Sequence, residues 1–282
     1  MAAKGRFPAA PNPAVGCVIS IDENIIGEGY TRPAGENHAE IEALNMVQDP
    51  LGSCVYVTLE PCSHEGRTGP CAQALIDAGV ARVVIACEDP NPQVCGQGIQ
   101  LLKDAGIEVD CGLLEDQARD LNQGFIKRHE QGLPWVLVKM AASMDGRTAM
   151  ASGQSQWVTT PASRHDVQKL RAKSCAIITG IGTQLMDDPS LTVRITSEQL
   201  GIDDVLQQPL RVVVDSQLQM SATARMLVQP GKTLIATLDG KSQREKAGAL
   251  IAAGAEVVFL PAHGKHVDLH ALLRDLADRQ CN

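Results

Sequence analysis

A histidine, a glutamate and two cysteines in the first third of the chain have the types and spacing that metal-assisted hydrolysis needs. His38 and Glu40 lie at the start of an expected helix, Cys62 follows a Glu-Pro pair, and Cys71 follows a proline. One imidazole and two thiolates give a zinc ion three protein ligands, which leaves its fourth tetrahedral position open for water. The spacing therefore predicts one catalytic zinc ion per chain, held by His38, Cys62 and Cys71.

Glu40 is the candidate proton carrier, because the chemistry needs a base that is not itself a ligand. Zinc lowers the pKa of a bound water towards about 7, and a nearby carboxylate can take that proton and pass it to a departing amine. Residues two positions apart on a regular helix face different directions. His38 and Glu40 can therefore meet at one metal only if His38 lies at the very start of its helix.

Less specific interpretations of the same residues remain open. Taken singly, a His-Ala-Glu at a helix start is typical of a surface turn, and a cysteine on a helix is typical of a buried core. His64 or Glu65, in the loop between the two cysteines, could supply a fourth ligand and make a zinc site structural. The joint pattern favours the catalytic site.

The elements around these residues alternate between short β-branched runs and helical patterns. Strands are expected at 14–20, 25–30, 54–59, 82–86 and 107–111, and helices at 38–47, 71–78 and 99–105. Strands that alternate with helices indicate an α/β domain with helices packed on a largely parallel sheet. The candidate ligands then lie at helix starts and at the end of a strand.

A Gly-Leu-Pro sequence at 132–134 interrupts the pattern, so we expect one domain at 1–132 and a second at 133–282. In the second half, strands are expected at 135–140, 175–179, 211–214, 233–237 and 256–260, and helices at 162–172, 243–253 and 267–278. A Gly-x-Gly follows the second of these strands, but the complete dinucleotide-binding fingerprint is absent. The residues alone indicate only a ligand-binding α/β domain.

Composition narrows the classes of protein that remain. The 282 residues carry a formal net charge of −8, and Lys and Arg are scattered rather than gathered into a basic stripe, which disfavours a nucleic-acid partner. No apolar run approaches the roughly 20 residues that span a bilayer, so no membrane association is expected. The nine cysteines, with no secretion signal ahead of them, indicate reduced thiols and a cytoplasmic location.

The metal motif resembles that of the cytidine-deaminase superfamily, His-x-Glu followed by Pro-Cys-x-x-Cys. Here eight residues, 63–70, separate the two cysteines instead of two. That longer loop resembles the riboflavin-biosynthesis branch, the bifunctional diaminohydroxyphosphoribosylaminopyrimidine deaminase/5-amino-6-(5-phosphoribosylamino)uracil reductase. The segments Pro-Asn-Pro-Ala-Val-Gly at 11–16 and Asp-Pro-Asn-Pro at 89–92 are similar to the same family.

For the first half, the resemblance implies a cytidine-deaminase-like three-layer α/β/α domain. It implies hydrolytic deamination of 2,5-diamino-6-(5-phosphoribosylamino)pyrimidin-4(3H)-one to 5-amino-6-(5-phosphoribosylamino)uracil. The substrate would be a small phosphorylated pyrimidine ribotide. The positions that match the family's contacts to the base and the ribose phosphate are Asn12, His64, Arg67, Asp89 and Asn91.

For the second half, segments 139–147, 155–157, 180–183 and 187–194 resemble the family's reductase domain, which is similar in fold to dihydrofolate reductase. The resemblance implies that NADPH reduces the ribosyl group to ribityl, and that chains form a homodimer through this domain. Matching cofactor positions are Ala141, Trp157, Thr183, Asp187 and Ser216, and matching substrate positions are Ser155, Arg171, Leu191 and Arg194. The alternative for Trp157 is a core-packing aromatic.

Both ends depart from the family pattern. Family members carry an amphipathic helix before the Pro-Asn-Pro segment and continue past Asn282 with further strands and a Glu- and Gly-rich loop, so the reductase domain is expected to be C-terminally incomplete. Three other functions therefore stay open. One is a deaminase with a non-functional reductase half, another is a nucleoside or tRNA deaminase, and the last is a ligand-binding or structural zinc protein without catalysis.

Overall fold

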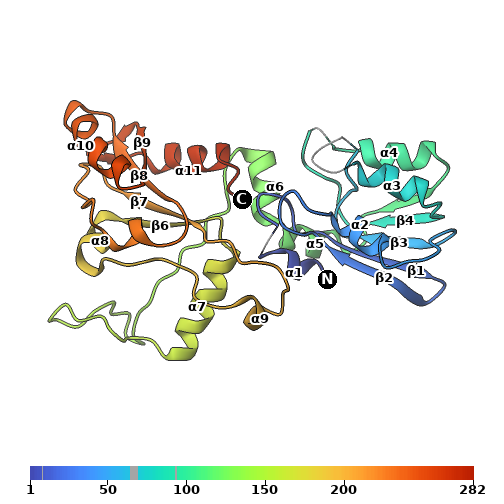
Figure 1. The fold of residues 1–282 in the computed structure, drawn as a ribbon, viewed down its shortest axis with the longest axis horizontal. Helices are drawn as coiled ribbons and strands as arrows, with labels where there is room; N and C mark the ends of the chain where they lie inside the picture. Colours follow the sequence, from blue (N-terminus) through green and yellow to red (C-terminus); the bar gives the residue numbers. More distant parts are fainter. Residues whose placement is uncertain (8, 64–68, 93) are drawn as a thin grey trace. The chain divides into compact units, whose positions relative to one another are not determined.

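The computed structural model describes residues 1–7, 9–63, 69–92 and 94–282, which form two compact units (Figure 1). The first unit comprises Met1–Trp135, Ile202–Val205 and Leu273–Asn282, and the second comprises Val136–Gly201 and Leu206–Leu272. None of the described helices is long and apolar enough to cross a membrane.

The first unit is built on a five-stranded sheet in the order β2-β1-β3-β4-β5. Its strands are β1 (Gly16–Ile21), β2 (Asn24–Tyr30), β3 (Cys54–Val57), β4 (Arg82–Ile85) and β5 (Glu108–Cys111). Strands β3, β4 and β5 are parallel, whereas β1 runs antiparallel to both of its neighbours. Because β3 and β4 are parallel, their carboxyl ends meet at one edge of the sheet, and the residues that follow these two strands lie at that edge.

Helices pack on this sheet and complete its core. They are α1 (Ala2–Gly5), α2 (Ala39–Leu44), α3 (Cys71–Asp77), α4 (Gln97–Asp104), α5 (Glu115–Leu121) and α6 (Gln123–Gln131). Figure 1 shows α3 and α4 side by side, and these two helices contact each other. Phe125 and Ile126 of α6 join Ile19, Val55 and Leu75 in one buried apolar cluster.

Two glycines of β2 let α2 approach the sheet very closely. A Cβ at Gly29 would lie 2.2 Å from the carbonyl oxygen of Ala39, and one at Gly27 would lie 2.5 Å from that of Ala43. Any side chain at these positions would push the helix away. The glycines therefore fix the position of α2, which begins directly after His38.

The second unit contains a four-stranded parallel sheet in the order β6-β7-β8-β9. Its strands are β6 (Ala176–Gly180), β7 (Leu210–Val214), β8 (Thr233–Leu238) and β9 (Glu256–Leu260), with a short hairpin of β10 (Ala262–His263) and β11 (His266–Val267). The helices of this half of the chain are α7 (Pro161–Lys173), α8 (Ile181–Asp187), α9 (Ser197–Leu200), the 3₁₀ helix η1 (Arg225–Val228), α10 (Lys241–Ala252) and α11 (Leu269–Asp278).

The expected α/β class is confirmed, and most expected elements form within a few residues of their predicted bounds. The strand expected at 135–140 is wrong. These residues form neither helix nor strand, and Val138 and Met140 are 76% and 75% exposed. Within the described residues no other strand pairs with this run, and an apolar run without a hydrogen-bonding partner does not become a strand. Sequence reasoning also missed α5, α6 and α8.

Candidate active site

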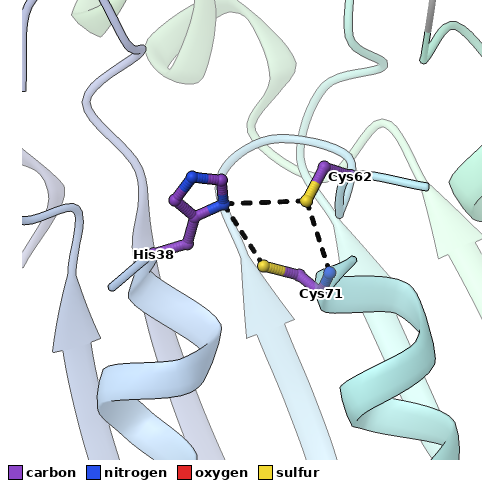
Figure 2. Close-up of side chains that lie close together, drawn as sticks. All are labelled: His38, Cys62 and Cys71. Atoms are coloured by element: carbon purple, nitrogen blue, oxygen red, sulfur yellow. Dashed lines mark hydrogen bonds between the residues drawn. The ribbon is translucent and has the colours of Figure 1, made fainter. Parts of the chain in front are cut away.

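His38, Cys62 and Cys71 converge from three different segments of the first unit (Figure 2). Their ligand atoms all lie within 4.8 Å of one another. The Nδ1 atom of His38 lies 3.3 Å from the Sγ atom of Cys71 and 3.6 Å from that of Cys62. The imidazole therefore faces both sulfurs with the same nitrogen.

His38 is the N-cap of α2, with an extended backbone at φ −78° and ψ 165°. The prediction that His38 precedes the regular helix is confirmed, and this is why His38 and Glu40 reach the same place. Glu40 lies in the first turn of α2 and is only 3% exposed.

The start of α3 holds the two cysteines together. Cys71 is the first residue of α3, and its backbone N–H donates to the Sγ atom of Cys62 at 3.3 Å. The N–H of Ala72 donates to the carbonyl oxygen of Cys62 at 3.1 Å. The first turn of a helix leaves its N–H groups without partners in the helix, so Cys62 satisfies two of them and gains stabilisation for a thiolate.

The surroundings of the two sulfurs shift their pKa values in opposite directions. A hydrogen bond from the Cys71 thiol, followed in importance by one from His38, lowers the pKa of Cys62 to about 4 against the opposing effect of burial. The neighbouring Cys62 and burial raise the pKa of Cys71 well above its usual value. Of the two sulfurs, Cys62 is thus the one whose surroundings favour the thiolate.

Burial also sets the chemistry of Glu40. Desolvation, and then the charge of Cys62, raise the pKa of its carboxyl to about 7, although hydrogen bonding and the charge of His38 act in the other direction. A carboxyl group with a pKa near neutrality can both accept and donate a proton. Cys17 of β1 lies close enough for Glu40 to raise its pKa further, after burial, so Cys17 remains a thiol.

The donor set fits zinc. One nitrogen and two sulfurs within 4.8 Å of one another are the soft ligands that Zn²⁺ takes in tetrahedral sites. Among the described residues, no fourth histidine, cysteine or carboxylate belongs to this group. His64 and Glu65, the alternative fourth ligands, lie outside the described residues.

Asp89 and Asn91 lie on the loop after β4, at the sheet edge where Cys62 follows β3. Asp89 is 7% exposed, and the Asn91 N–H donates to its Oδ1 atom at 2.8 Å. The backbone N–H of Asp89 donates to the carboxylate of Glu60, which lies two residues before Cys62. Asn12 is half-buried on the turn before β1, and His64 and Arg67 fall outside the described residues.

Asp89→Asn is expected to raise stability. Burial, more than the charges of Glu60 and Cys62, raises the pKa of Asp89 from 3.8 to about 6. Between these values the folded state binds more protons than the unfolded state, so the free energy of unfolding falls as pH rises through this window and stays low above it. Urea unfolding should show the variant about 1–3 kcal/mol more stable at pH 7.5 and unchanged below pH 4. A variant less stable at pH 7.5 would contradict this.

Sequence reasoning missed Asn122, which holds the loop that carries Asn12. Its Oδ1 atom accepts from the N–H of Ala14 at 2.8 Å, and its Nδ2 atom donates to the carbonyl oxygen of Ala14 at 3.0 Å. Asn122 is 5% exposed and lies between α5 and α6. Its partner is 108 residues away in the chain, so no local pattern could have indicated the contact.

In the second unit, three of the candidate reductase residues follow the carboxyl ends of β6 and β7 in the chain. Thr183 and Asp187 lie four positions apart on α8, directly after β6, and Ser216 follows β7. The hydroxyl of Ser216 accepts from the N–H of Val267 at 3.1 Å. Leu191 lies on the loop after α8, with a positive φ of 50°.

Arg171 and Arg194 form a pair of like charges. Burial, and then the charge of Arg194, lower the pKa of Arg171, whose guanidinium donates to the carbonyl oxygen of Thr192 at 3.1 Å. Neither arginine forms an ion pair with a carboxylate in the part of the chain that the structure describes. Two neighbouring guanidinium groups of this kind suit a phosphate.

The remaining candidates, Ala141, Ser155 and Trp157, lie in the segment 136–160, which has neither helices nor strands. Trp157 is 70% exposed, with the guanidinium of Arg164 4.3 Å from the centre of its ring. The alternative of a core-packing aromatic is therefore wrong.

Comparisons with known proteins agree with this arrangement. Residues 1–87 match the cytidine and deoxycytidylate deaminase zinc-binding region, and residues 134–282 match the RibD C-terminal domain. The riboflavin biosynthesis protein RibD of Escherichia coli K12 is 48% identical, over 100% of this chain and 77% of its own length. RibD of Haemophilus influenzae is 45% identical, over 100% of this chain and 75% of its own length.

Solved structures give the same result. Acinetobacter baumannii RibD superposes with a TM-score of 0.87 at 43% identity, covering 99% of this chain and 75% of that one. A deaminase/reductase of Thermotoga maritima, described as acting on diaminohydroxyphosphoribosylaminopyrimidine and on 5-amino-6-(5-phosphoribosylamino)uracil, gives a TM-score of 0.86 at 32% identity, covering 99% of this chain and 75% of that one.

Fold and site together define a zinc-dependent deaminase joined to a reductase. The metal-ligand cluster lies in the half that matches the deaminase zinc-binding region, and the second half matches the reductase domain. The chain belongs to the RibD family, the bifunctional deaminase/reductases of riboflavin biosynthesis, and covers both domains.

Proposed function

We propose that residues 1–132 deaminate 2,5-diamino-6-(5-phosphoribosylamino)pyrimidin-4(3H)-one to 5-amino-6-(5-phosphoribosylamino)uracil, and that residues 133–282 reduce the ribosyl group of this product with NADPH. The observation that carries the first step is the cluster of His38, Cys62 and Cys71 beside a buried Glu40. His38, Cys62 and Cys71 would hold the zinc. When bound there, Zn²⁺ supplies an activated water as the nucleophile.

Glu40 is the catalytic residue of this step. It takes a proton from the attacking water and returns it to the amine that leaves as ammonia. Its position in the first turn of α2, two residues from His38, places it beside the cluster, and its burial keeps bulk water from competing for the proton. Asn12, Asp89 and Asn91, with His64 and Arg67 from the loop between the cysteines, are proposed to hold the base and the ribose phosphate.

The choice of substrate is tested by a panel. The zinc-loaded chain should release ammonia from the diaminopyrimidine ribotide at least about 100-fold faster than from cytidine or from a tRNA anticodon stem-loop, because cytidine lacks the phosphate and the chain lacks a basic stripe. Ammonia would be measured with a coupled glutamate dehydrogenase assay. A preference for either alternative substrate would contradict the proposal.

For the reduction step, we propose that NADPH contacts Ala141, Trp157, Thr183, Asp187 and Ser216, and that the substrate contacts Ser155, Arg171, Leu191 and Arg194. The proposal is supported by the two arginines without carboxylate partners in the described residues and by the exposed ring of Trp157. Nicotinamide fluorescence should saturate on titration with the chain, with a Kd below about 1 mM. Failure to saturate would favour a chain that performs the deamination alone.

We also propose a homodimer formed through the reductase half, located in the cytoplasm. The exposed apolar side chains of Leu137, Val138 and Met140 support the first statement, since contiguous exposed apolar groups mark contact surfaces. The reduced thiols expected of a chain with nine cysteines and no secretion signal support the second. Sedimentation velocity would test the dimer, and a monomer at every concentration would contradict it.

A further inference from the structure

Glu60 accepts hydrogen bonds from four backbone N–H groups, two in the loop after β4 and two in the first turn of α4. Its Oε2 atom accepts from Asp89 at 3.2 Å and Gly96 at 3.0 Å, and its Oε1 atom accepts from Gly98 at 2.9 Å and Ile99 at 3.1 Å. The side chain is 3% exposed. A buried carboxylate held by four amides is fully satisfied without any cation.

The donors belong to the start of α4 and to the loop that precedes it. Gly96 is the N-cap of α4, and Gly98 and Ile99 lie in its first turn, where N–H groups have no partner within the helix. A carboxylate at this end of a helix is also favoured by the helix dipole. Glu60 therefore caps α4 from outside, although it comes from the segment that follows β3.

The same junction is tightly packed. A Cβ at Gly98 would lie 2.0 Å from the carbonyl oxygen of Pro61, the residue between Glu60 and the metal ligand Cys62. The backbone of α4 therefore lies directly against the Pro61–Cys62 turn. The Glu60 N–H also donates to the carbonyl oxygen of Cys87 at 2.9 Å, which joins the ends of β3 and β4 once more.

These contacts connect the metal ligands to the residues proposed to hold the substrate. Cys62 lies two residues after Glu60. Asp89 donates its N–H to Glu60, and its own carboxylate accepts from the N–H of Asn91. The Glu60 carboxylate therefore joins the loop between β4 and α4, which carries Asp89 and Asn91, to the segment that carries Cys62.

We propose that Glu60 is a positioning residue of the deaminase, which sets Asp89 and Asn91 against the metal-ligand turn so that they bind the pyrimidine ribotide. Glu60 contacts neither metal ligand nor substrate in this role. The inference rests on the proposed function, because it takes the ribotide as substrate. If Glu60 had a purely structural role, its substitution would lower the stability, the zinc content and the turnover together.

Glu60→Gln tests the proposal with little change in shape. Glutamine keeps one acceptor oxygen, but its amide group faces two N–H donors that it cannot accept from. We expect the KM for the diaminopyrimidine ribotide to rise at least about tenfold while kcat changes less than about threefold, which is the signature of lost substrate positioning. Zinc content should stay at that of the unmodified chain. Hydrogen exchange should become faster at residues 96–99 and remain unchanged in β1.

Gly98→Ala tests the same junction from the side of α4, because its added methyl group meets Pro61. It should reproduce the rise in KM. Gly248→Ala is the matched control, since that position lies in α10 with nothing within 4 Å of the added methyl group. If the unmodified chain is active and the Glu60→Gln variant has an unchanged KM, the inference about Glu60 is overturned, but the proposed function is not. A fall in both kcat and zinc content of the Glu60→Gln variant would also overturn the inference. An unmodified chain that neither binds nor deaminates the ribotide would overturn the proposed function and, with it, the inference.

Discussion

Glu40→Gln is expected to abolish deamination while the chain keeps its zinc. Glutamine has nearly the same shape as glutamate but cannot carry the proton from water to the departing amine. General acid–base catalysis contributes about 10²–10⁴-fold, so kcat should fall at least about 100-fold. The fold should tolerate the change, because glutamine fills the same buried space and desolvation already disfavours a charged carboxylate there. Steady-state ammonia release and metal analysis of the same sample measure both effects.

Glu42→Gln is the matched control for this variant. Glu42 lies on the same helix, but its carboxylate pairs with Arg32 at 2.8 Å and is not part of the cluster of His38, Cys62 and Cys71. That variant should retain its activity to within about threefold, as expected for a partly exposed ion pair. A Glu40→Gln chain that remained as active as the control would remove Glu40 from the catalytic role.

Cys71→Ala is expected to lose both the metal and the activity. Only His38 and Cys62 would remain as ligands, which leaves too few for a stable zinc site. Turnover should fall at least about 100-fold even with added zinc, and the metal bound after gel filtration should fall well below one ion per chain. Alanine is well suited to the first position of a helix, so α3 itself should form.

Cys111→Ala provides the comparison, because this cysteine lies at the end of β5 and is exposed. It should keep one zinc ion and normal turnover. Stoichiometric zinc and unchanged activity in Cys71→Ala would show that the metal is held elsewhere.

The metal site could be predicted from the sequence because its signals are local. A proline ahead of Cys71 marks the start of α3, and the short spacing between His38 and Glu40 requires the histidine to precede its helix, as it does. Each of these features depends on a few neighbouring residues. The convergence of His38, Cys62 and Cys71 was therefore predictable from their residue types and these local signals.

Contacts between distant segments could not be predicted in the same way. Glu60 stands between an apolar strand and a proline, which is typical of a turn, and its partners lie 29 to 39 residues further on. Asn122 has the same kind of long-range role.

The strand that was wrongly predicted at 135–140 also depends on contacts between distant segments. An apolar run indicates what a segment can form, whereas a strand also needs a neighbour to pair with, and the sequence of the run does not contain that information.

The most direct test of the account is deamination of the diaminopyrimidine ribotide by the zinc-loaded chain in ¹⁸O-labelled water. Hydrolytic deamination predicts one ammonia released for each aminouracil product, with the label in the new carbonyl oxygen, and loss of both after chelation of the zinc. Ammonia release without incorporation of the label, or turnover that survives removal of the metal, would contradict the assignment of His38, Cys62, Cys71 and Glu40 as a zinc deaminase centre.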